Sequence, residues 1–308
     1  MPLDIGIVIL NWNTRDLLQR CLATVFASEG DFTFEVVIVD NASTDGSADM
    51  VREKFPQATL IESDVNGGYP YGNNLGLRHL GYHDSGGAAP DPPRYALLLN
   101  PDTEVPADAL YEMIRYMDAR PEIGVAGPKL MLPSGDLDMA CRRSFPTPAV
   151  SFYRFSGLGK LFPNSPRFAR YNMTFVDPDV EIEVDSVVGA YMQVRKAAIE
   201  AVGLLDETFF MYGEDLDWAY RIKQAGWVVF YNPAVTVTHV KRAASKKSKR
   251  AQMEFYRAML IFYRKHYRSG TPLLLHSLIL MGILAKGGRA MWPEVRQPSP
   301  LKQSLNPS

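Results

Sequence analysis

Apolar runs that end in polar side chains constrain the fold of this chain more than any other feature. Four of them lie among the first 102 residues, separated by helical patterns, and they span Ile5–Leu10, Glu35–Val39, Thr59–Glu62 and Tyr95–Leu99. Continuous apolar strands that alternate with helices are typical of a parallel sheet covered by helices on both faces. The sequence therefore predicts an α/β fold with a Rossmann-like, mostly parallel sheet.

Helical and strand patterns continue beyond the fourth run, after a Gly/Pro-rich loop at 83–94. Helices are predicted at 16–27, 47–55, 71–80, 107–118, 196–202 and 214–225, and further strands at 184–195, 227–232 and 235–240. Residues 131–183 hold many prolines, aromatics and arginines with weak periodicity, so we expect long loops there.

Charge is distributed unevenly along the 308 residues, although the net charge is only −1. Residues 1–240 carry a net charge of −13 and residues 241–308 one of +12. An acidic body with a basic tail indicates that the tail meets an anionic partner. We therefore expect one large domain over 1–240, a basic helical extension over 241–292 and a disordered tail over 293–308.

The two cysteines, Cys21 and Cys141, are far apart and form no CxxC motif. This pattern supports neither a disulfide framework nor a zinc cluster, and it favours a reducing, cytoplasmic compartment. The segment Met1–Leu10 lacks a basic start and reads as a strand rather than a signal peptide.

Polar side chains follow the predicted strands at the edge where ligands bind in such sheets. Asn11, Asp40, Asn66 and Asp102 all fall there. Asp40, with Asn41 beside it, can accept hydrogen bonds from a ribose or a base N–H, and the helix that follows favours an anionic group at its N-terminus. Helix capping is the alternative explanation for the polar residues that come next.

A glycine-rich turn, Asn66–Gly76, enters the third predicted helix. Gly67 and its glycine neighbour would let the backbone approach a ligand, and Asn66 and Asn73 offer both donors and acceptors. The turn does not match the GxxxxGK[ST] phosphate loop. An ordinary tight turn remains the alternative.

The turn Asn100-Pro101-Asp102 is the predicted position of a divalent cation. Hard cations take oxygen ligands, commonly one or two carboxylates together with substrate phosphates. His239, at the end of the last apolar strand, could add a nitrogen ligand, which would favour manganese over magnesium. The alternatives are a turn aspartate and a structural histidine.

An acidic cluster, Gly213–Trp218, opens the last helix of the domain. Glu214, Asp215 and Asp217 are three acids in four residues, which exceeds the needs of a helix dipole. A carboxylate near apolar groups can have a raised pKa and act as a base. We assign that role to Asp215.

Six motifs in order now carry a resemblance to glycosyltransferase family 2, from residue 5 to about 240. They are the residues 8–13, 39–47, 66–68, 100–102, 185–190 and 213–218. Three features are most similar to the bacterial rhamnosyltransferase branch. They are the Asn-Pro-Asp form of the metal motif, the pair Arg142-Arg143 and the Tyr-Gly-Glu-Asp-Leu-Asp-Trp string.

The resemblance implies a GT-A fold and an inverting transfer of a sugar, with dTDP-rhamnose as the favoured donor and a glycan or lipid-diphosphate-linked acceptor of cell-surface polysaccharide. The nucleotide-sugar half would span about 1–105 and the acceptor half about 106–240. The implied donor residues are Asn11, Asp40, Asn41, Asn66, Gly67, Asn73, Asn100 and Asp102. The implied acceptor-side residues are Gly189, Ala190, Glu214, Asp217, Trp218, Arg142 and Arg143, with Asp215 as base and with Asp102 and His239 on manganese or magnesium.

Two departures from the family pattern limit this comparison. The metal motif Asn100-Pro101-Asp102 has one carboxylate where Asp-x-Asp has two, which predicts weaker metal dependence. A Gln-x-x-Arg-Trp string, the family's mark of processive synthases, is absent from the sequence, so single-sugar addition is favoured.

The basic extension predicts contact with a membrane surface. Lys241–Arg268 holds ten Lys/Arg and one acid, and a 13-residue apolar run, Leu273–Ala285, follows it. Since about 20 apolar residues are needed to span a bilayer, we expect the run to lie on an anionic surface, peripheral on the inner face of the cytoplasmic membrane. Packing against the domain is the alternative, and the few interleaved aromatics argue against nucleic acid.

Three further interpretations stay open at this stage. The donor could be a UDP-hexose with the same fold and reaction. A sugar-1-phosphate nucleotidyltransferase would share the core, but it needs a basic, glycine-rich loop where this chain has Asn11–Thr14. A nucleotide-sugar-binding protein without turnover would not need both Asp102 and Asp215.

Overall fold

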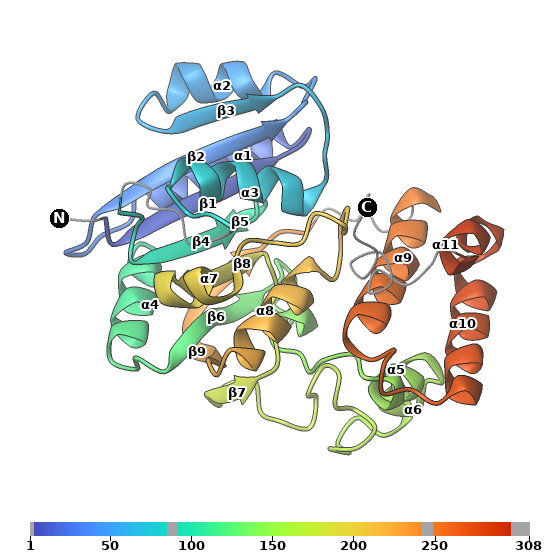
Figure 1. Ribbon diagram of the computed structural model, residues 1–308. Helices are drawn as coiled ribbons and strands as arrows, with labels where there is room; N and C mark the ends of the chain where they lie inside the picture. The colour runs from blue at the N-terminus through green and yellow to red at the C-terminus, as the bar shows by residue number, and fades with distance from the viewer. Residues whose placement is uncertain (1–2, 85–90, 242–248, 297–308) are drawn as a thin grey trace.

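One mixed sheet forms the centre of the molecule (Figure 1). The computed structural model describes residues 3–84, 91–241 and 249–296. Within this part of the chain nine strands join in the sheet. They are β1 (Ile5–Asn11), β2 (Phe34–Asn41), β3 (Thr59–Ser63), β4 (Tyr95–Leu99), β5 (Thr103–Glu104), β6 (Ile123–Met131), β7 (Ile182–Val184), β8 (Tyr191–Arg195) and β9 (Val228–His239).

The sheet is parallel in its first half and mixed in its second. Its order is β3-β2-β1-β4-β8-β6-β9-β5, and β7 pairs with β9. Strands β3, β2, β1 and β4 run parallel, as the buried apolar runs predicted. Strand β8 runs antiparallel to both β4 and β6, whereas β6 and β9 are parallel. The Rossmann-like arrangement therefore holds for the half that carries the first four motifs.

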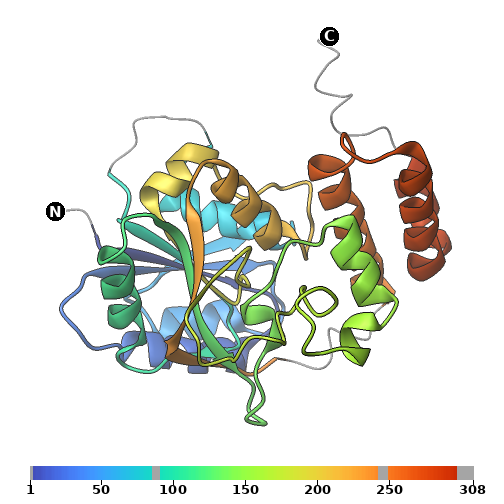
Figure 2. The same ribbon diagram turned by 90° about the horizontal axis from the view of Figure 1, so that it is seen from below.

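Helices cover both faces of the sheet (Figure 2). The main-domain helices are α1 (Arg15–Phe26), α2 (Ser47–Lys54), α3 (Tyr69–His79), α4 (Ala109–Asp118), α5 (Pro148–Phe155), α6 (Leu158–Leu161), α7 (Lys196–Val202) and α8 (Glu214–Gln224). Helices α3, α7 and α8 lie on one face, and α1, α2 and α4 lie on the other. Their apolar sides and the buried strands form one continuous core.

Strand β6 and two short helices escaped the sequence analysis. Strand β6 contains Gly124, Gly127 and Pro128, residues that weaken a strand pattern. The glycines are needed because an added Cβ would come within 2.8 Å of Val187 at Gly127 and within 2.7 Å of Trp227 at Gly124. The last two predicted strands, 227–232 and 235–240, are one continuous strand, β9. At the predicted break, the pairing of β9 with β6 shifts register. Helices α5 and α6 form within the predicted long loops.

The C-terminal extension packs on the domain through its first helix. It consists of α9 (Lys249–His266), α10 (Leu273–Gly287) and α11 (Trp292–Arg296). Aromatic rings of Phe262 and His266 on α9 lie against Tyr220 of α8, with ring centroids 6.0 and 4.1 Å apart. The predicted disordered tail lies outside the described residues from 297 onward, and residues 293–296 form part of α11 instead.

A buried ionic cluster fixes α9 to α8. The side chain of Asp217 is fully buried, and it accepts hydrogen bonds from His266 Nε2 at 2.7 Å and Arg221 Nε at 2.9 Å. Lys265 Nζ lies 2.8 Å from the same carboxylate. Although burial alone would raise it, these partners lower the pKa of Asp217 to about 2. Asp217 is thus ionised in the folded protein and attaches the extension to the domain.

Replacing Asp217 should destabilise the protein strongly. Removing one partner from a buried ion pair costs about 3–5 kcal/mol, because the remaining charges lose their partner. We expect Asp217→Ala to lower the free energy of unfolding by that amount in urea at pH 7. Since the folded pKa is below the usual 3.8, the wild-type contribution should be lost as the pH falls from about 4 toward 2.

The matched control is Asp49→Ala. Asp49 forms an exposed ion pair with Arg52 on α2, which contributes only about 0–1 kcal/mol. Equal losses of stability in the two variants would contradict the structural role of Asp217.

Candidate active site

The carboxyl ends of β1 and β2 hold a network of buried polar side chains. Asn11 and Asp40 lie opposite each other in the sheet, and Asn11 Nδ2 donates to Asp40 Oδ2 at 2.9 Å and to Ser43 Oγ at 3.0 Å. The backbone N–H of Ser43 donates to the second oxygen of Asp40 at 2.8 Å. The network fixes the Asp40 carboxylate at the ligand-binding edge of the sheet.

A second group of bonds joins β2 to the glycine turn. Asn41 Nδ2 donates to Asn66 Oδ1 at 2.9 Å, and the N–H of Gly67 donates to Asn41 Oδ1 at 3.2 Å. Gly68 has a φ of 92°, and an added Cβ would come 2.3 Å from the carbonyl oxygen of Phe210. Only glycine allows this approach, which brings the turn against the loop before α8.

Asp102 and His239 meet at the end of β4 and β9. Asp102 Oδ1 lies 3.3 Å from His239 Nε2, is buried and has no hydrogen-bond partner. The other ring nitrogen, Nδ1, lies 2.8 Å from Asp138 Oδ2, and Lys241 Nζ lies 2.5 Å from Oδ1 of the same carboxylate. A carboxylate behind a histidine fixes the ring orientation and the tautomer. Asp102 Oδ1, which accepts no hydrogen bond, and the ring nitrogen that faces it could together bind one cation.

The donor set fits a cation that takes most of its ligands from substrate. No group of three or more His, Cys, Asp or Glu side chains within the described ranges could hold a metal by itself. One carboxylate and one imidazole, together with phosphate oxygens, make the open site that manganese or magnesium uses on nucleotides. Burial lowers the pKa of His239, but Asp102 and Asp138 outweigh burial and raise it. A bound cation would replace that proton.

Asp215, in the first turn of α8, is held by a buried ion pair. Arg143 Nη2 donates to Asp215 Oδ2 at 2.6 Å, and the N–H of Gly189 donates to the same oxygen at 3.1 Å. Burial lowers the pKa of Arg143, but Asp215 outweighs burial and the net shift is upward. The carboxylate therefore keeps a fixed position and a permanent cationic partner.

Backbone bonds connect Asp215 with the predicted metal site. Gly189 binds Asp215, and the next residue, Ala190, accepts a hydrogen bond from the N–H of Asn100 at 3.0 Å. Tyr69 OH donates to the carbonyl oxygen of Gly189 at 2.8 Å. A Cβ at Gly189 would come 2.6 Å from that hydroxyl. The neighbouring residues Gly189 and Ala190 thus connect the candidate base with the Asn100–Asp102 turn.

Glu214 is a buried carboxyl group with an unusual protonation state. Its Oε2 is buried and has no hydrogen-bond partner. Burial first, and then Asp215, raise the pKa of Glu214 to about 8. Two adjacent buried carboxylates cannot both ionise cheaply, so Glu214 is protonated at neutral pH while Arg143 stabilises the charge on Asp215. Such perturbed pairs are typical of sites that move protons.

A carboxylate base near a cation site, beside a polar edge suited to a nucleotide, can carry out group transfer from a phosphorylated donor. The sequence model of glycosyl transferase family 2 matches residues 6–169, more than half of the chain. The chain belongs to this family. It is therefore a glycosyltransferase.

Two relatives of this glycosyltransferase are named rhamnosyltransferases. It is 28% identical over 236 residues to the N-acetylglucosaminyl-diphospho-decaprenol L-rhamnosyltransferase of Mycobacterium tuberculosis, a match that covers 76% of this chain and 75% of the relative. It is 25% identical to rhamnosyltransferase WbbL of Escherichia coli K12, over 76% of this chain and 82% of WbbL. These matches agree with the predicted similarity to the rhamnosyltransferase branch.

A solved structure supports the fold. The mannosyltransferase PcManGT from Pyrobaculum calidifontis, in complex with GDP-Man and Mn²⁺, superposes with a TM-score of 0.57 at 17% identity. The match covers 99% of this chain and 79% of that chain. The predicted GT-A fold is confirmed.

Four of the predicted site residues of the glycosyltransferase have contacts that serve the scaffold. Asp217 binds α9, as described above. Trp218 is fully buried and donates through Nε1 to the carbonyl oxygen of Gly203 at 2.9 Å. Arg142 binds the carbonyl oxygens of Val176 and Asp177. Asn73 is buried in α3, where its Nδ2 donates to the carbonyl oxygen of Tyr69 at 2.9 Å.

Two residues of the site were missed by the sequence analysis. Asp138, which fixes His239, lies in the segment without periodicity, 101 residues before its partner. Tyr69, which bridges the glycine turn and Gly189, looked like one more aromatic at a helix start. The only sequence signal for Tyr69 is its position directly after Gly67-Gly68. Asp138 has none.

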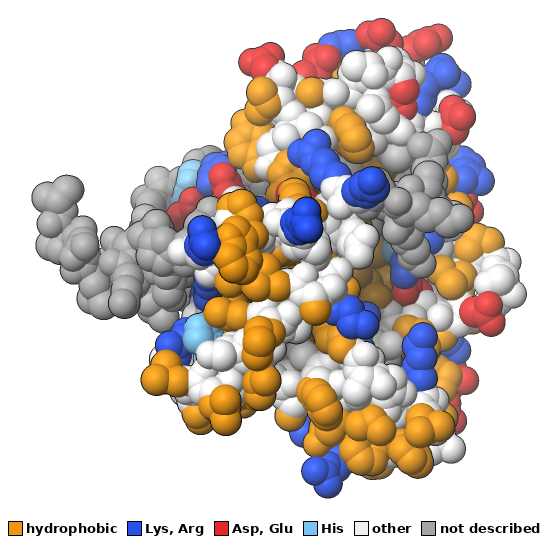
Figure 3. Space-filling model, turned by 90° about the vertical axis from the view of Figure 1, so that its right-hand side faces the viewer, with side chains coloured by type: hydrophobic (Ala, Val, Ile, Leu, Met, Phe, Trp, Pro, Cys, Tyr) orange, Lys and Arg blue, Asp and Glu red, His pale blue; other side chains and the backbone are white. Residues whose placement is uncertain are grey.

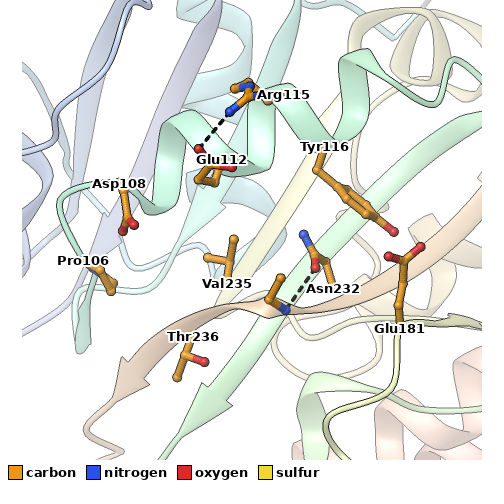
Figure 4. Close-up of a pocket in the computed structure, with 10 residues that line it drawn as sticks. Pro106, Asp108, Glu112, Arg115, Tyr116, Glu181, Asn232, Val235 and Thr236 are labelled. Carbon is orange, nitrogen blue, oxygen red and sulfur yellow. Dashed lines mark hydrogen bonds and ion pairs between the residues drawn. The ribbon is translucent and has the colours of Figure 1, made fainter.

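A separate cleft of about 350 Å³ lies between α4 and β9 (Figure 4). Glu112 and Arg115 on α4 form an ion pair at its rim, and Asn232 Oδ1 accepts from the N–H of Ala234. The residues that line it include none of the predicted donor, metal or catalytic residues. We therefore do not assign it to the reaction.

The cation site can be tested by metal binding alone. We expect Asp102→Asn to weaken Mn²⁺ binding by about 100-fold in the presence of dTDP, because the unpaired oxygen is lost. Asp138→Asn should weaken it by about 10- to 100-fold, since the ring of His239 loses its orienting carboxylate. Isothermal titration calorimetry measures both.

The control for this prediction is Asp136→Asn, an exposed residue near Asp138 that contacts Ser134. It should bind Mn²⁺ like the unmodified protein. Unchanged affinity in Asp102→Asn would rule out this position as the cation site.

The raised pKa of Glu214 should make the free energy of unfolding decrease as the pH rises. Its folded pKa of about 8 is above the usual 4.5, so the folded state loses stability as the pH rises between these values. Glutamine does not ionise. We expect Glu214→Gln to raise the free energy of unfolding by about 4 kcal/mol more at pH 8 than at pH 4.5, since the folded pKa lies well above the usual one.

Urea unfolding at the two pH values measures this difference. Glu112→Gln, at a partly exposed carboxylate on α4, serves as the control and should show no such trend. A gain for Glu214→Gln that is equal at both pH values would contradict the raised pKa.

Proposed function

We propose that this protein is an inverting, non-processive hexosyltransferase that moves rhamnose from dTDP-rhamnose to a lipid-diphosphate-linked acceptor of cell-surface polysaccharide synthesis. The observation that carries the proposal is the connection between Asp102 and Asp215. The Asp215 carboxylate accepts from the N–H of Gly189, and the next residue, Ala190, accepts from the N–H of Asn100, two residues before Asp102. Burial first, and then the charges of Glu214, Asp215 and Asp102, raise the pKa of Tyr69, which contacts Gly189.

The donor nucleotide would occupy the edge formed by β1, β2 and the glycine turn. Asp40 and Asn41 would recognise the nucleoside, with Asn11 and Asn66 fixing their positions. The half of the chain over about 1–105 would thus bind the nucleotide sugar. The half over about 106–240 would supply the acceptor side.

Asp102 and His239 would hold a divalent ion against the diphosphate. When bound, such an ion supplies charge stabilisation to the departing diphosphate. Asn100 supports the site because its backbone binds Ala190. The motif Asn100-Pro101-Asp102 supplies one carboxylate, which agrees with a cation held largely by substrate oxygens.

Asp215 would take the proton from the acceptor hydroxyl. Arg143 and the N–H of Gly189 hold one of its oxygens, and the other accepts from the N–H of Leu216 at 2.7 Å. A single displacement with one base inverts the anomeric centre. Arg143 and Gly189 would therefore be positioning groups on the acceptor side.

Support for the sugar and the acceptor comes from the relatives. Two of them are named rhamnosyltransferases, and the mycobacterial one carries a diphospho-decaprenol acceptor in its name. A lipid-linked acceptor agrees with the basic extension of this chain, which would meet an anionic membrane through residues 241–292. No helix in the described segments is both long and apolar enough to cross a bilayer. We propose a peripheral position on the inner face of the cytoplasmic membrane.

The donor and the base are tested in one experiment. Calorimetry with dTDP-rhamnose, UDP-glucose, UDP-galactose and GDP-mannose should give tight binding for dTDP-rhamnose, strengthened by Mn²⁺. Asp215→Asn should bind this donor with unchanged affinity but lose at least 100-fold in transfer, since the acceptor hydroxyl keeps its proton. Transfer is measured as release of dTDP with a prenyl-diphosphate-linked N-acetylglucosamine.

Asp49→Asn, at an exposed residue of α2, is the control and should transfer normally. Preference for a UDP-hexose would discard rhamnose and keep the reaction class. Full activity in Asp215→Asn together with loss of activity in Glu214→Gln would move the role of base to Glu214.

A further inference from the structure

Helix α10 has far more exposed apolar surface than a helix of a water-exposed domain. It contains ten apolar side chains in 15 residues, yet only Ile283 is buried. Leu274 is 76% exposed, and Leu273, Leu278 and Met281 are exposed as well. A helix that is apolar on all sides is normally buried, either in a protein core or in a membrane.

A second apolar surface lies on α5 and α6, which follow Arg143 in the chain. Phe152 and Phe155 on α5 are exposed, as are Leu161, at 69%, and Phe162 at the end of α6. Pro148, the first residue of α5, is five residues after Arg143, whose side chain binds Asp215. This apolar surface is therefore close in sequence to the arginine that binds the candidate base.

The two apolar surfaces are neighbours because both pack on α9. The ring of Phe155 lies 6.5 Å from that of Tyr256 on α9. Tyr256 also packs with Leu260, Ile283 and Met291, which join α9, α10 and the segment before α11. Figure 3 shows hydrophobic side chains gathered over this side of the molecule, with Lys and Arg among them.

Positive charge surrounds these surfaces. Residues 148–176 contain four Lys/Arg and no acid, and residues 249–296 contain nine Lys/Arg and two acids. The exposed members are Arg154, Lys160, Arg167, Arg170, Lys249, Arg250, Lys286, Arg289 and Arg296. Of the two acids, Glu254 is buried, and both pair with Arg257. Acidic side chains are most numerous at the upper end of the view in Figure 3.

We propose that α10 and the α5–α6 segment together form one docking face for an anionic lipid bilayer. Exposed leucines and phenylalanines would enter the boundary between headgroups and acyl chains, and the surrounding Lys and Arg would bind lipid phosphates. Trp292, which is 49% exposed beside Arg296, is placed as an interfacial anchor. The positive charge favours a bilayer over a second copy of this chain.

This face deepens the proposed function, on which it rests for the lipid-linked acceptor. The extension alone would only attach the protein to a membrane. The α5–α6 segment adds a second docking surface, which begins five residues after Arg143, the partner of the candidate base. A diphosphate group at the membrane surface would then reach the acceptor side without leaving its lipid.

Co-sedimentation with vesicles tests the face in the full-length protein. We expect binding to vesicles of phosphatidylglycerol and phosphatidylcholine, and at least tenfold weaker binding to phosphatidylcholine alone. Leu274→Glu/Leu278→Glu and Phe152→Glu/Leu161→Glu should each weaken binding to the anionic vesicles at least tenfold. Val65→Glu, at an exposed apolar residue after β3, should bind like the unmodified protein.

Brominated lipids give a second measurement that does not depend on these variants. They should quench tryptophan fluorescence, and Trp292→Phe should remove most of the quenching, whereas Trp12→Phe should not. Trp12 is the matched control because it is also exposed. Circular dichroism and dTDP-rhamnose binding of each variant verify folding, so a failure of the face is distinguished from a failure of the donor assignment.

Three results would overturn the proposal. Unchanged vesicle binding in Leu274→Glu/Leu278→Glu would exclude α10, and unchanged binding in Phe152→Glu/Leu161→Glu would exclude a joint face. A dimer that dissociates in the α10 variant, with no vesicle binding by the unmodified protein, would assign the surface to a second copy.

Discussion

The buried ion pair between Arg143 and Asp215 is the interaction on which the site depends. It joins a segment that sequence patterns leave undefined to the first turn of α8, over 72 residues of chain. Together with the N–H of Gly189, it fixes the position of the Asp215 carboxylate. Burial first, and then the charge of Asp215, raise the pKa of the neighbouring Glu214. One salt bridge therefore positions the candidate base beside a second carboxyl group whose pKa is raised.

Helix α8 carries two acidic residues with different duties. Asp215 faces the reaction side through Gly189 and Arg143, whereas Asp217 binds Lys265 and His266 of α9. Residues two positions apart in a helix project to nearly opposite sides, so a separation of two residues is enough to divide the roles. The element that would orient the base is thus also the one to which the C-terminal extension is attached.

Sequence patterns predicted the parallel half of the sheet and its polar edge well. The runs before Asn11, Asp40 and Asp102 are buried strands whose periodicity depends only on their own residues. Local patterns could not predict β6, since its glycines are required by Val187 and Trp227, which are distant in the chain. They also could not reveal that Asp138 lies behind His239 or that Asp217 belongs to the scaffold. Both facts depend on long-range contacts between ionisable groups, which carry no period.

Strand β8 reverses the direction of its neighbours β4 and β6. Parallel strands all bring their carboxyl ends to the ligand edge, where they offer carbonyl oxygens. The reversed strand instead brings its amino end, Gly189-Ala190-Tyr191, and with it a backbone N–H. A sheet with uniform direction would have no main-chain donor at this point to hold a carboxylate. Topology, and not only side-chain chemistry, thereby supplies a hydrogen bond to the group that would accept the proton.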